Sequence, residues 1–292
     1  MIPPPGRHGG DGEAVARGLG LDPATVLDLS ASLNPWAPPV AALVAKHADA
    51  VGRYPDAAAA TASLAAAMGL DPARLLLTNG GSEAITLVAR ELGGGVVAEP
   101  EFALHPRAAD GPRWRSDPHN PSGRLAAADD RADVWDEAFY PLATGRWTAG
   151  RDALVVGSLT KVWACPGLRL GYVLADDVGR FARHQPHWSV STLALAVLED
   201  ALAATHLEVW AAAVREQRAA LVALLAAHGL VADPSDAPWV LVRAPGLRAR
   251  LAPHAVVVRD CASFGLPDHA RIAVPGPDGL ARLAHALERS TP

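Results

Sequence analysis

The stretch GSLTKVWACPGLRLGY, residues 157–172, is the most informative part of the sequence. Lys161 follows the apolar run ALVVG, which predicts a buried strand. Ser158 and Thr160 place two hydroxyls beside this lysine, and Arg169 comes eight residues after it. The combination suits a phosphorylated aldehyde, because an amine can form a Schiff base while hydroxyls and a guanidinium bind the phosphate. A surface lysine after a strand gives the same pattern, so this stretch alone leaves both interpretations open.

Lysine is scarce in this chain. Among 26 basic residues only Lys46 and Lys161 are lysines, and the other 24 are arginines. Arginine stays protonated in proteins, whereas lysine can lose its proton and act as a nucleophile. A lysine retained in a polar turn after a buried strand is therefore a candidate for chemistry that arginine cannot perform.

Composition excludes several classes of protein. The chain has 292 residues, of which 50% are hydrophobic and 20% are charged, and its formal net charge is −5. These values exclude a disordered tail protein, and the net negative charge provides no positive surface potential that would attract nucleic acid. The length favours two closely packed lobes. Cys165 and Cys261 lie in no C-x-x-C or cysteine/histidine spacing, and no H-E-x-x-H motif is present. Neither a disulfide framework nor a metal site is therefore predicted.

No segment indicates a signal peptide or a membrane span. The start, MIPPPGRHGGDG, lacks an apolar core, and the Ala/Leu-rich runs are interrupted by charges. The two isolated cysteines fit a reducing compartment. We therefore expect a cytoplasmic protein with neither a membrane partner nor a nucleic-acid partner.

Short apolar runs alternate with helical segments between residues 51 and 186. The strand candidates are RLLLTNGG, GGVVAEPEF, ADVWDEAF, DALVVGSLTK and LRLGYVLAD, with a helix predicted from about Ser82 to Leu92. Strands separated by helices are typical of α/β units on a mostly parallel sheet. We therefore predict an α/β large domain over residues 51–186.

The rest of the chain predicts a smaller lobe. Residues 189–228 carry apolar positions at helical spacing, which indicates one long helix or two consecutive ones. APWVLVRA, HAVVVRDC and HARIAVP then predict three strands, followed by a closing helix to about Arg289. We assign residues 187–292 to this helical stretch and a small α+β domain, and residues 1–50 to an N-terminal arm and a small-domain segment.

Two further segments carry groups that suit a phosphorylated cofactor. RLLLTNGGSEAI predicts a strand, a glycine turn and a helix start, where the amides around Gly81 and Ser82 would bind an anion. ADVWDEAF places Asp136 at the carboxyl end of an apolar strand, where α/β sheets gather ligands. A buried carboxylate needs a cationic partner, and a pyridinium N–H would supply one. Taken singly, Ser82 is also compatible with a helix N-cap and Asp136 with a helix-capping acid.

In order and placement, these segments resemble pyridoxal-5′-phosphate (PLP) enzymes of the aspartate-aminotransferase fold over nearly the whole chain. The most specific part is S-L-T-K followed by P-G-L-R-L-G-Y, and D-P-H-N-P-S-G at 117–123 resembles the family turn N-P-x-N-P-T-G. The resemblance implies a mostly parallel large domain, a smaller α+β C-terminal domain and PLP as the cofactor. It also implies a homodimer.

The resemblance implies a role for each matching residue. Lys161 is the lysine that forms the internal aldimine with PLP, and Asp136 pairs with the ring nitrogen. Tyr54 of GRYPD matches a tyrosine that crosses the dimer interface to the neighbour's phosphate. The other implied cofactor contacts are Gly81, Ser82, Ser158, Thr160 and Arg169 at the phosphate, Asn120 at the ring hydroxyl, and Phe102 of EPEF stacked on the ring.

Within this fold the chain is most similar to the branch that contains histidinol-phosphate aminotransferase and L-threonine-O-3-phosphate decarboxylase. H-G-G at 8–10, L-D-L-S-A-S-L-N-P at 27–35 and H-W-S-V-S at 187–191 favour the decarboxylase. Phe139 favours it too, because the aminotransferases usually have D-E-A-Y where this chain has D-E-A-F. The residues that the resemblance places at the substrate are His8 and Asn34, which approach it, and Arg259 and Arg271, which bind its anionic ends.

The chain also departs from the family pattern. Only fourteen residues lie between Phe102 and Asp117, and the stretch from Gly123 to Asp136 is compressed as well. About one α/β unit is therefore predicted to be missing, which affects the strand count and the wall of the site beside Phe102.

Three functions stay open. The first is decarboxylation of a small phosphorylated amino acid, as in threonine-phosphate decarboxylation for cobalamin synthesis, and the second is aminotransfer of the histidinol-phosphate type. Which one occurs depends on which Cα bond stands perpendicular to the cofactor ring, and a sequence does not define that angle. The third is a non-catalytic PLP-binding paralogue, which the shortened core favours and the intact lysine disfavours. A Rossmann-type nucleotide binder is disfavoured, because TNGGSEAI lacks G-x-G-x-x-G.

Overall fold

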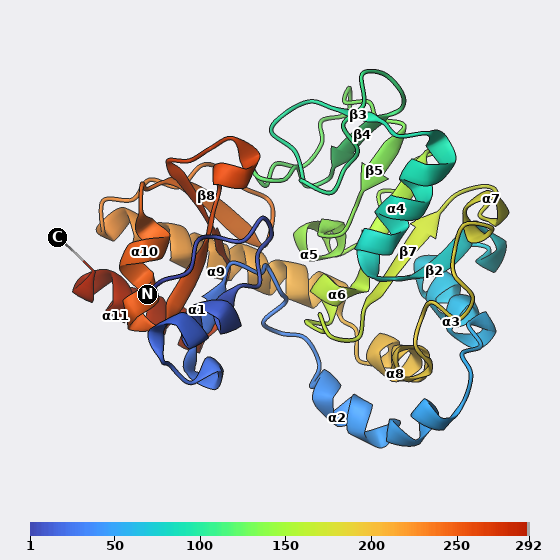
Figure 1. Cartoon of the computed structure of the whole chain (residues 1–292), viewed down its shortest axis with the longest axis horizontal. Coiled ribbons are helices and arrows are strands. Elements are labelled where there is room, and N and C mark those ends of the chain that lie inside the picture. The colour runs from blue at the N-terminus through green and yellow to red at the C-terminus, as the bar shows by residue number, and fades with distance from the viewer. Residues whose placement is uncertain (291–292) are drawn as a thin grey trace.

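The larger of two sheets contains the strands that the apolar runs predict. Its six strands lie in the order β2-β7-β6-β5-β4-β3 (Figure 1) in the computed structural model, which describes residues 1–290. They are β2 (Leu75–Asn79), β3 (Val96–Val97), β4 (Arg113–Ser116), β5 (Val134–Asp136), β6 (Leu154–Ser158) and β7 (Leu170–Leu174). Strands β3 to β6 run parallel, whereas β7 is antiparallel to both of its neighbours. The expected mostly parallel α/β sheet is confirmed.

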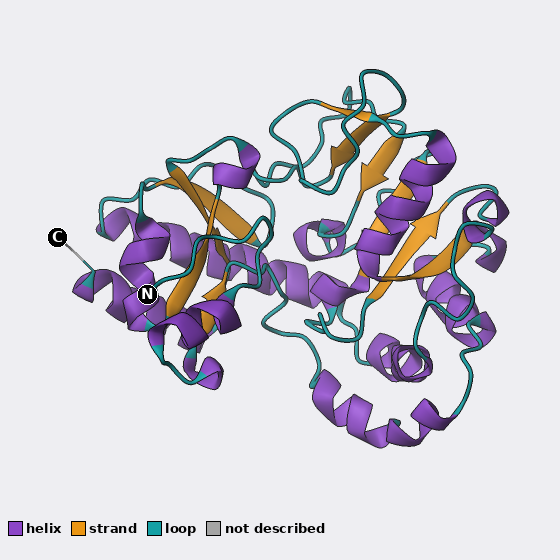
Figure 2. Cartoon of the chain, in the orientation of Figure 1, coloured by secondary structure: helices purple, strands orange, loops and turns teal. Residues whose placement is uncertain are grey.

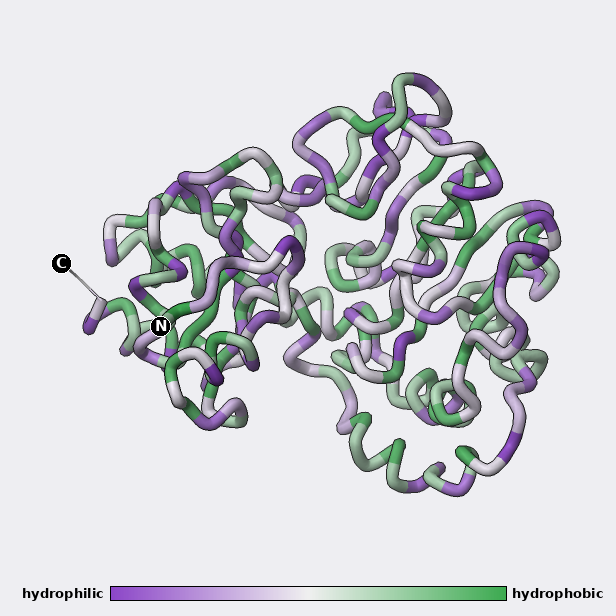
Figure 3. The backbone as a smooth tube through the Cα atoms, in the orientation of Figure 1, coloured by the Kyte–Doolittle hydropathy of each residue, from purple (hydrophilic) through white to green (hydrophobic). Residues whose placement is uncertain are grey.

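Helices cover both faces of this sheet, because its central strands are apolar on both sides (Figure 2). On one face α3 (Ala58–Met68) and α8 (Thr192–Ala203) pack against a core that includes Trp135. On the other face α4 (Gly80–Leu92) packs against Trp114. Figure 3 shows hydrophobic residues along α8 and the neighbouring strands. The buried layers hold the ends of the strands, and therefore the candidate site, in place.

Two connections between parallel strands lack a helix. Residues 98–112 join β3 to β4 and residues 117–133 join β4 to β5, and neither segment contains a helix or a strand. Parallel strands are usually joined by a crossover that includes a helix. Here Ala126 and Ala132 of the second connection pack directly against the core that contains Trp135. The shortened sequence between β3 and β5 therefore corresponds to crossover helices that this fold lacks.

The second sheet has four strands in the order β1-β9-β10-β8. Strand β1 (Leu27–Leu29) runs parallel to β9 (Val256–Asp260), and β10 (His269–Ala273) runs antiparallel to β9 and to β8 (Trp239–Arg243). The closing helix predicted from the sequence is α11 (Pro277–Arg289). Because β1 joins this sheet, segments from the two ends of the chain form one smaller lobe (Figure 1).

The predicted forty-residue helical stretch consists of two helices. After α8 ends, α9 (Leu207–Ala227) begins beyond a short break. Trp210 near the start of α9 is buried in the core of the larger lobe, whereas Leu225 near its end is buried in the core of the smaller one. Helix α9 therefore connects the two lobes.

The remaining helices are short. They are α1 (Gly12–Leu19), α2 (Val40–Lys46), α5 (Tyr140–Thr144), α6 (Leu159–Val162), α7 (Gly179–Ala182) and α10 (Leu247–Leu251), with 3-10 turns at Pro23–Thr25, Ala48–Gly52, Pro72–Arg74, Ala252–His254 and Ala262–Phe264. Both α2 and α8 pack against the core of the larger lobe. The domain boundaries expected after residues 50 and 186 stay predictions. Across residues 1–290, none of the helices has the length and apolar character needed to cross a membrane.

Candidate active site

A cavity of about 330 Å³ lies where the carboxyl ends of the larger sheet face the smaller lobe. Its walls come from the ends of β5 and β6, the start of α4, the N-terminal arm, and strands β9 and β10. Open α/β sheets bind ligands at this edge, because parallel strands bring their carboxyl ends together there. The sequence-predicted residues that line the cavity are His8, Gly81, Ser82, Phe102, Asn120, Asp136, Ser158, Thr160, Lys161, Arg169, Arg259 and Arg271.

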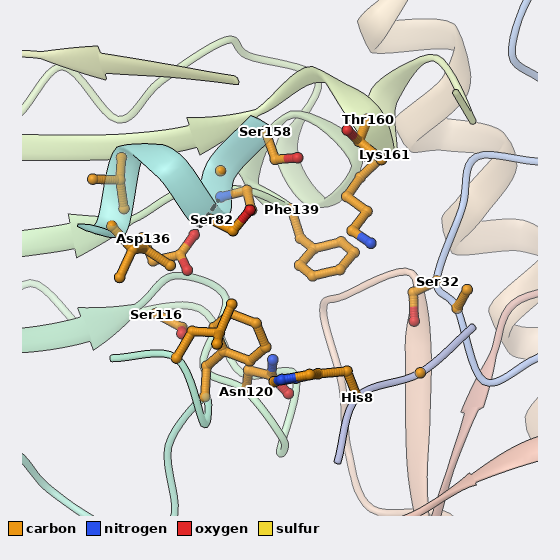
Figure 4. A pocket seen from close by; sticks show the side chains of 18 of the residues that line it. His8, Ser32, Ser82, Ser116, Asn120, Asp136, Phe139, Ser158, Thr160 and Lys161 are labelled. Carbon is orange, nitrogen blue, oxygen red and sulfur yellow. Dashed lines mark hydrogen bonds between the residues drawn. The ribbon is translucent and has the colours of Figure 1, made fainter. Parts of the chain in front are cut away.

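Lys161 lies in α6 directly after β6, and its amine points into the cavity (Figure 4). Burial, together with the positive charges of Arg271 and Arg169, lowers the pKa of Lys161 to about 8. The amine lies 5.7 Å from the centre of the Phe139 ring. A lysine with this pKa is partly neutral near pH 7 and can attack an aldehyde.

The start of α4 forms an anion-binding end of the cavity. Gly81 and Ser82 lie in its first turn, where free amides and the helix dipole attract anions. Arg169 donates a hydrogen bond to Ser82 Oγ (2.8 Å), and its φ of +57° is one that residues other than glycine rarely adopt. A Cβ at Gly80 would collide with the Arg169 guanidinium, and a Cβ at Gly171 would overlap the backbone of Gly80. The two glycines therefore allow the guanidinium and the helix start to come together.

Two hydroxyls complete this end of the cavity. Ser158 is the last residue of β6, and Thr160 follows in α6. Both are buried and line the cavity. A cluster of amides, hydroxyls and one guanidinium is the donor set that binds a phosphate ester.

Asp136 occupies the side of the cavity opposite Lys161 (Figure 4). Its Oδ1 accepts a hydrogen bond from the amide of Ala138 (3.0 Å), and its Oδ2 lies 3.1 Å from Nε2 of His105. A carboxylate only accepts, so the His105 Nε2–H donates to it. The imidazole is fully buried behind Asp136. Sequence reasoning missed His105, although its position three residues after Phe102 in EPEFALH is a local signal that it belongs to the same wall.

Phe102 presents a ring to the same cavity. It packs edge-on against His105, with centroids 5.6 Å apart, and against His8, with centroids 5.9 Å apart. His8 reaches this position because the carbonyl of Arg7 accepts a hydrogen bond from Arg259 (2.8 Å). Burial and the charges of Arg259 and Arg7 lower the pKa of His8, so its ring favours the neutral form. The N-terminal arm thus contributes one wall of the cavity.

Two buried guanidiniums occupy the smaller-lobe side. Arg259 in β9 and Arg271 in β10 lie opposite each other in the register of the two strands. Arg271 donates to Asn120 Oδ1 (2.7 Å) and stacks on Trp239 at 4.7 Å. Burial and the neighbouring Arg259 lower the pKa of Arg271 to about 9. Within residues 1–290 neither guanidinium forms an ion pair with a carboxylate, so an anionic ligand would relieve an electrostatic cost of folding.

Two predicted site residues lie outside the cavity. Tyr54 is 79% exposed and stacks on Trp188, with ring centroids 4.8 Å apart. Asn34 is buried, its side-chain amide donates to the carbonyl of Val162 (2.9 Å), and its backbone amide donates to the carbonyl of Lys161 (3.1 Å). In the single chain Asn34 therefore positions the lysine segment, and the substrate and cofactor roles of both residues stay predictions.

Ser32 lines the cavity although sequence reasoning did not select it. Its hydroxyl is buried and has no hydrogen-bond partner, and Figure 4 shows it on the same side of the cavity as His8. The local signal was its place in L-D-L-S-A-S-L-N-P, shortly after the residues that form β1, and the neighbouring Ser30 and Ala31 line the cavity too.

These residues fit PLP. A lysine with a lowered pKa, a glycine-lined phosphate cradle and a buried carboxylate are the three groups that this cofactor requires. Lys161 would hold the aldehyde carbon, the start of α4 with Arg169 the phosphate, and Asp136 the ring nitrogen. Within residues 1–290 no group of three or more His, Cys, Asp or Glu side chains is arranged to hold a metal ion.

Comparison with known proteins gives the same result. The family model "Aminotransferase class I and II" matches residues 116–288. The chain is 31% identical to threonine-phosphate decarboxylase of Salmonella typhimurium, an alignment that covers 96% of this chain and 95% of the relative. It is 29% identical to histidinol-phosphate aminotransferase of Halorubrum lacusprofundi, with 94% and 93% covered. Both alignments are longer than this chain's 292 residues, so the relatives contain residues that it lacks.

The fold is shared with solved structures. Histidinol-phosphate aminotransferase from Sinorhizobium meliloti in complex with pyridoxal-5′-phosphate superposes with a TM-score of 0.79 at 19% identity, covering 95% of this chain and 94% of that one. The expected aspartate-aminotransferase-like fold is confirmed. The chain belongs to the class I and II aminotransferase family and is a pyridoxal-phosphate-dependent enzyme.

Proposed function

We propose that the enzyme acts on a small phosphorylated amino acid and removes its carboxylate, as L-threonine-O-3-phosphate decarboxylase does. The observation that supports this substrate class is the pair of buried guanidiniums, Arg259 and Arg271, which lack a carboxylate partner in the described chain and share a cavity with Lys161. A substrate with two anionic groups, a carboxylate and a phosphate, suits two cationic side chains. The hydroxyl of Ser32 and the ring of His8 add neutral polar groups to the same wall.

The residues divide the chemistry between them. Bound PLP supplies an electron sink for the charge left at the substrate Cα. Lys161, whose pKa is about 8, can accept or return a proton at that carbon near neutral pH. Asp136, held by His105 and by the amide of Ala138, would keep a proton on the ring nitrogen. The arginines would orient the substrate and so select which Cα bond breaks.

Decarboxylation is proposed ahead of aminotransfer for two reasons. Phe139 stands where the aminotransferases usually carry tyrosine, and its ring faces the Lys161 amine. The segment L-D-L-S-A-S-L-N-P at 27–35, which resembles the decarboxylase, contributes Ser32 to the wall of the cavity. The alternative is aminotransfer of the histidinol-phosphate type, which the 29% identical relative supports. A non-catalytic binding protein is not proposed, because the chain belongs to a family of PLP-dependent enzymes and retains Lys161 in the cavity.

A homodimer is part of the proposal. Tyr54 and Trp188 form an exposed aromatic pair that does not line the cavity of their own chain, so they are accessible to a second copy. Tyr54 would then reach the phosphate end of the partner's site, as the resemblance implies. The two buried free cysteines support a cytoplasmic location.

A product assay tests the reaction. PLP-loaded protein is incubated with O-phospho-L-threonine, or with histidinol phosphate plus 2-oxoglutarate, and CO2 and glutamate are measured. We expect CO2 from phosphothreonine and much less from unphosphorylated threonine, with Lys161→Ala as the inactive control. Glutamate without CO2 would establish the aminotransferase alternative, and neither product from any of these substrates would contradict both.

A further inference from the structure

Arg151 joins two buried carboxylates beside the candidate site. It lies in the loop between α5 and β6, and its guanidinium donates to Glu137 Oε1 at 2.5 Å and to Asp117 Oδ2. The same guanidinium stacks on the ring of Trp135, 3.9 Å from its centre. Arg151 therefore makes three contacts with the segments at the ends of β4 and β5.

Both carboxylates depend on this cation. Glu137 is 0% exposed and Asp117 is 1% exposed, and within residues 1–290 Arg151 is the only ion-pair partner of either. Burial raises the pKa of Glu137, while the charge of Arg151 acts in the opposite direction. Removing one member of a buried ion pair leaves an uncompensated charge, which costs more than an exposed pair contributes.

The two carboxylates adjoin residues that line the cavity. Glu137 directly follows Asp136, and the Asp117 amide donates to the Asp136 carbonyl at 2.8 Å. Asp117 also begins the turn that carries Asn120, which accepts a hydrogen bond from Arg271. The guanidinium of Arg151 thus connects the segment that carries Asp136 to the segment that carries Asn120.

The missing crossover helices explain why such a connection is needed. The loops that join β3 to β4 and β4 to β5 contain no helix to cover the outer part of the sheet. On the face that carries Trp135, the indole is covered by Arg151 and, at 5.9 Å, by Arg115. A planar guanidinium can stack on an aromatic ring and bind two carboxylates at once, which lysine cannot.

We propose that Arg151 is a positioning residue for the cofactor site, which sets the separation of Asp136 and Asn120 and limits the negative charge beside Asp136. The inference rests on the proposed placement of the PLP ring between Lys161 and Asp136. Arg151, Asp117 and Glu137 together carry one net negative charge when ionised. Without the cation that charge doubles, and nearby negative charge raises the pKa of a neighbouring acid and of a protonated cofactor.

Charge and geometry are separated by four variants. Arg151→Met removes the positive charge, whereas Arg151→Lys keeps the charge but loses the planar guanidinium that can bind two carboxylates. Glu137→Gln removes one carboxylate. The double variant Arg151→Met/Glu137→Gln restores the original net charge of the cluster. Arg115→Met is the matched control, because Arg115 also lies over Trp135 but pairs with Asp130, which is partly exposed. For each protein we measure the Kd for PLP, the pH midpoint of the visible band of the Lys161–cofactor adduct, and the unfolding temperature.

We expect Arg151→Met to weaken PLP binding about 10-fold or more and to move the pH midpoint upward, because buried negative charge stabilises the protonated adduct. The double variant should return the midpoint towards that of the wild type. Arg151→Lys should keep the wild-type midpoint but bind PLP more weakly, and Arg115→Met should change neither quantity.

Several results would overturn the proposal. One is an Arg151→Met protein with a lower unfolding temperature but an unchanged Kd and midpoint, since that describes a purely structural residue. Another is an equal effect of Arg115→Met. If Arg151→Met does not fold, an unchanged Kd for Arg151→Lys overturns the proposal instead. A wild-type protein without a Lys161-dependent visible band would refute the placement of PLP itself, a failure distinct from the others.

Discussion

Lys161 illustrates how burial prepares a single residue for chemistry. Its amine is surrounded by protein and by the charges of Arg271 and Arg169, and these lower its pKa to about 8. An ordinary exposed lysine has a pKa near 10.4 and is almost entirely protonated at neutral pH. The neighbours of Lys161 therefore increase the fraction of neutral amine without changing the residue type.

This pKa predicts the pH dependence of cofactor attachment. The rate at which PLP binds covalently to the apoenzyme should rise with pH and level off above a midpoint near 8, because only the neutral amine attacks an aldehyde. Stopped-flow absorbance measures the rate, and Lys161→Ala should give no borohydride-reducible adduct. A rate that does not change through pH 8 would contradict the assigned pKa.

His105 gives a second prediction at the residue scale. His105→Leu removes the donor to Asp136 Oδ2, and a hydrogen bond to a charged group contributes about 1.5–3 kcal/mol. The Kd for PLP should therefore increase by about 10-fold or more. His285→Leu, a change at an exposed residue of α11, should leave the Kd unchanged. Equal affinities in both variants would show that Asp136 does not depend on His105.

At the scale of elements, the contact of β7 with the start of α4 determines the shape of the phosphate end. Gly171 in β7 touches the backbone of Gly80 and Gly81, and no side chain fits between them. A local sequence pattern identifies the strand and the helix, but this close approach depends on the pairing of β2 with β7.

Gly171→Ala should therefore destabilise the protein by about 1–3 kcal/mol, the usual cost of overpacking a core, and should weaken PLP binding. The control is Gly167→Ala, where an added Cβ meets no atom within 4 Å and the cost should stay below about 0.5 kcal/mol. Urea unfolding followed by circular dichroism gives both values. Similar urea midpoints and m-values for Gly171→Ala and Gly167→Ala would contradict the close packing of β7 against the start of α4.

At the scale of the whole molecule, the candidate site combines segments from both lobes and, in the proposed dimer, from both chains. Tyr54 lies outside its own cavity, so a shared site requires the partner. In hybrid dimers of Lys161→Ala and Tyr54→Ala chains, one of the two sites has both native residues. Co-expression in equal amounts should restore about a quarter of wild-type activity, because half of the dimers are hybrids with one intact site each.

Light scattering should give a dimer mass for the wild type, and each variant alone should be far less active than the mixture. If mixing restores no activity although hybrid dimers are present, Tyr54 does not act across the interface.

Local patterns in the sequence predicted five of the six strands of the larger sheet, all but β4, together with the lysine after β6, the acid at the end of β5 and the glycine turn at the start of α4. These are local features, because apolar runs, glycine turns and short motifs depend on neighbouring residues. Comparison with the family pattern also predicted a shortened segment between Phe102 and Asp136. Three contacts became visible in the folded chain alone: His105 lies behind Asp136, Arg151 joins Asp117 to Glu137, and Asn34 supports the lysine segment. Each of these contacts joins groups that are distant along the chain or separated by irregular loops, and no local pattern specifies where such groups meet after packing.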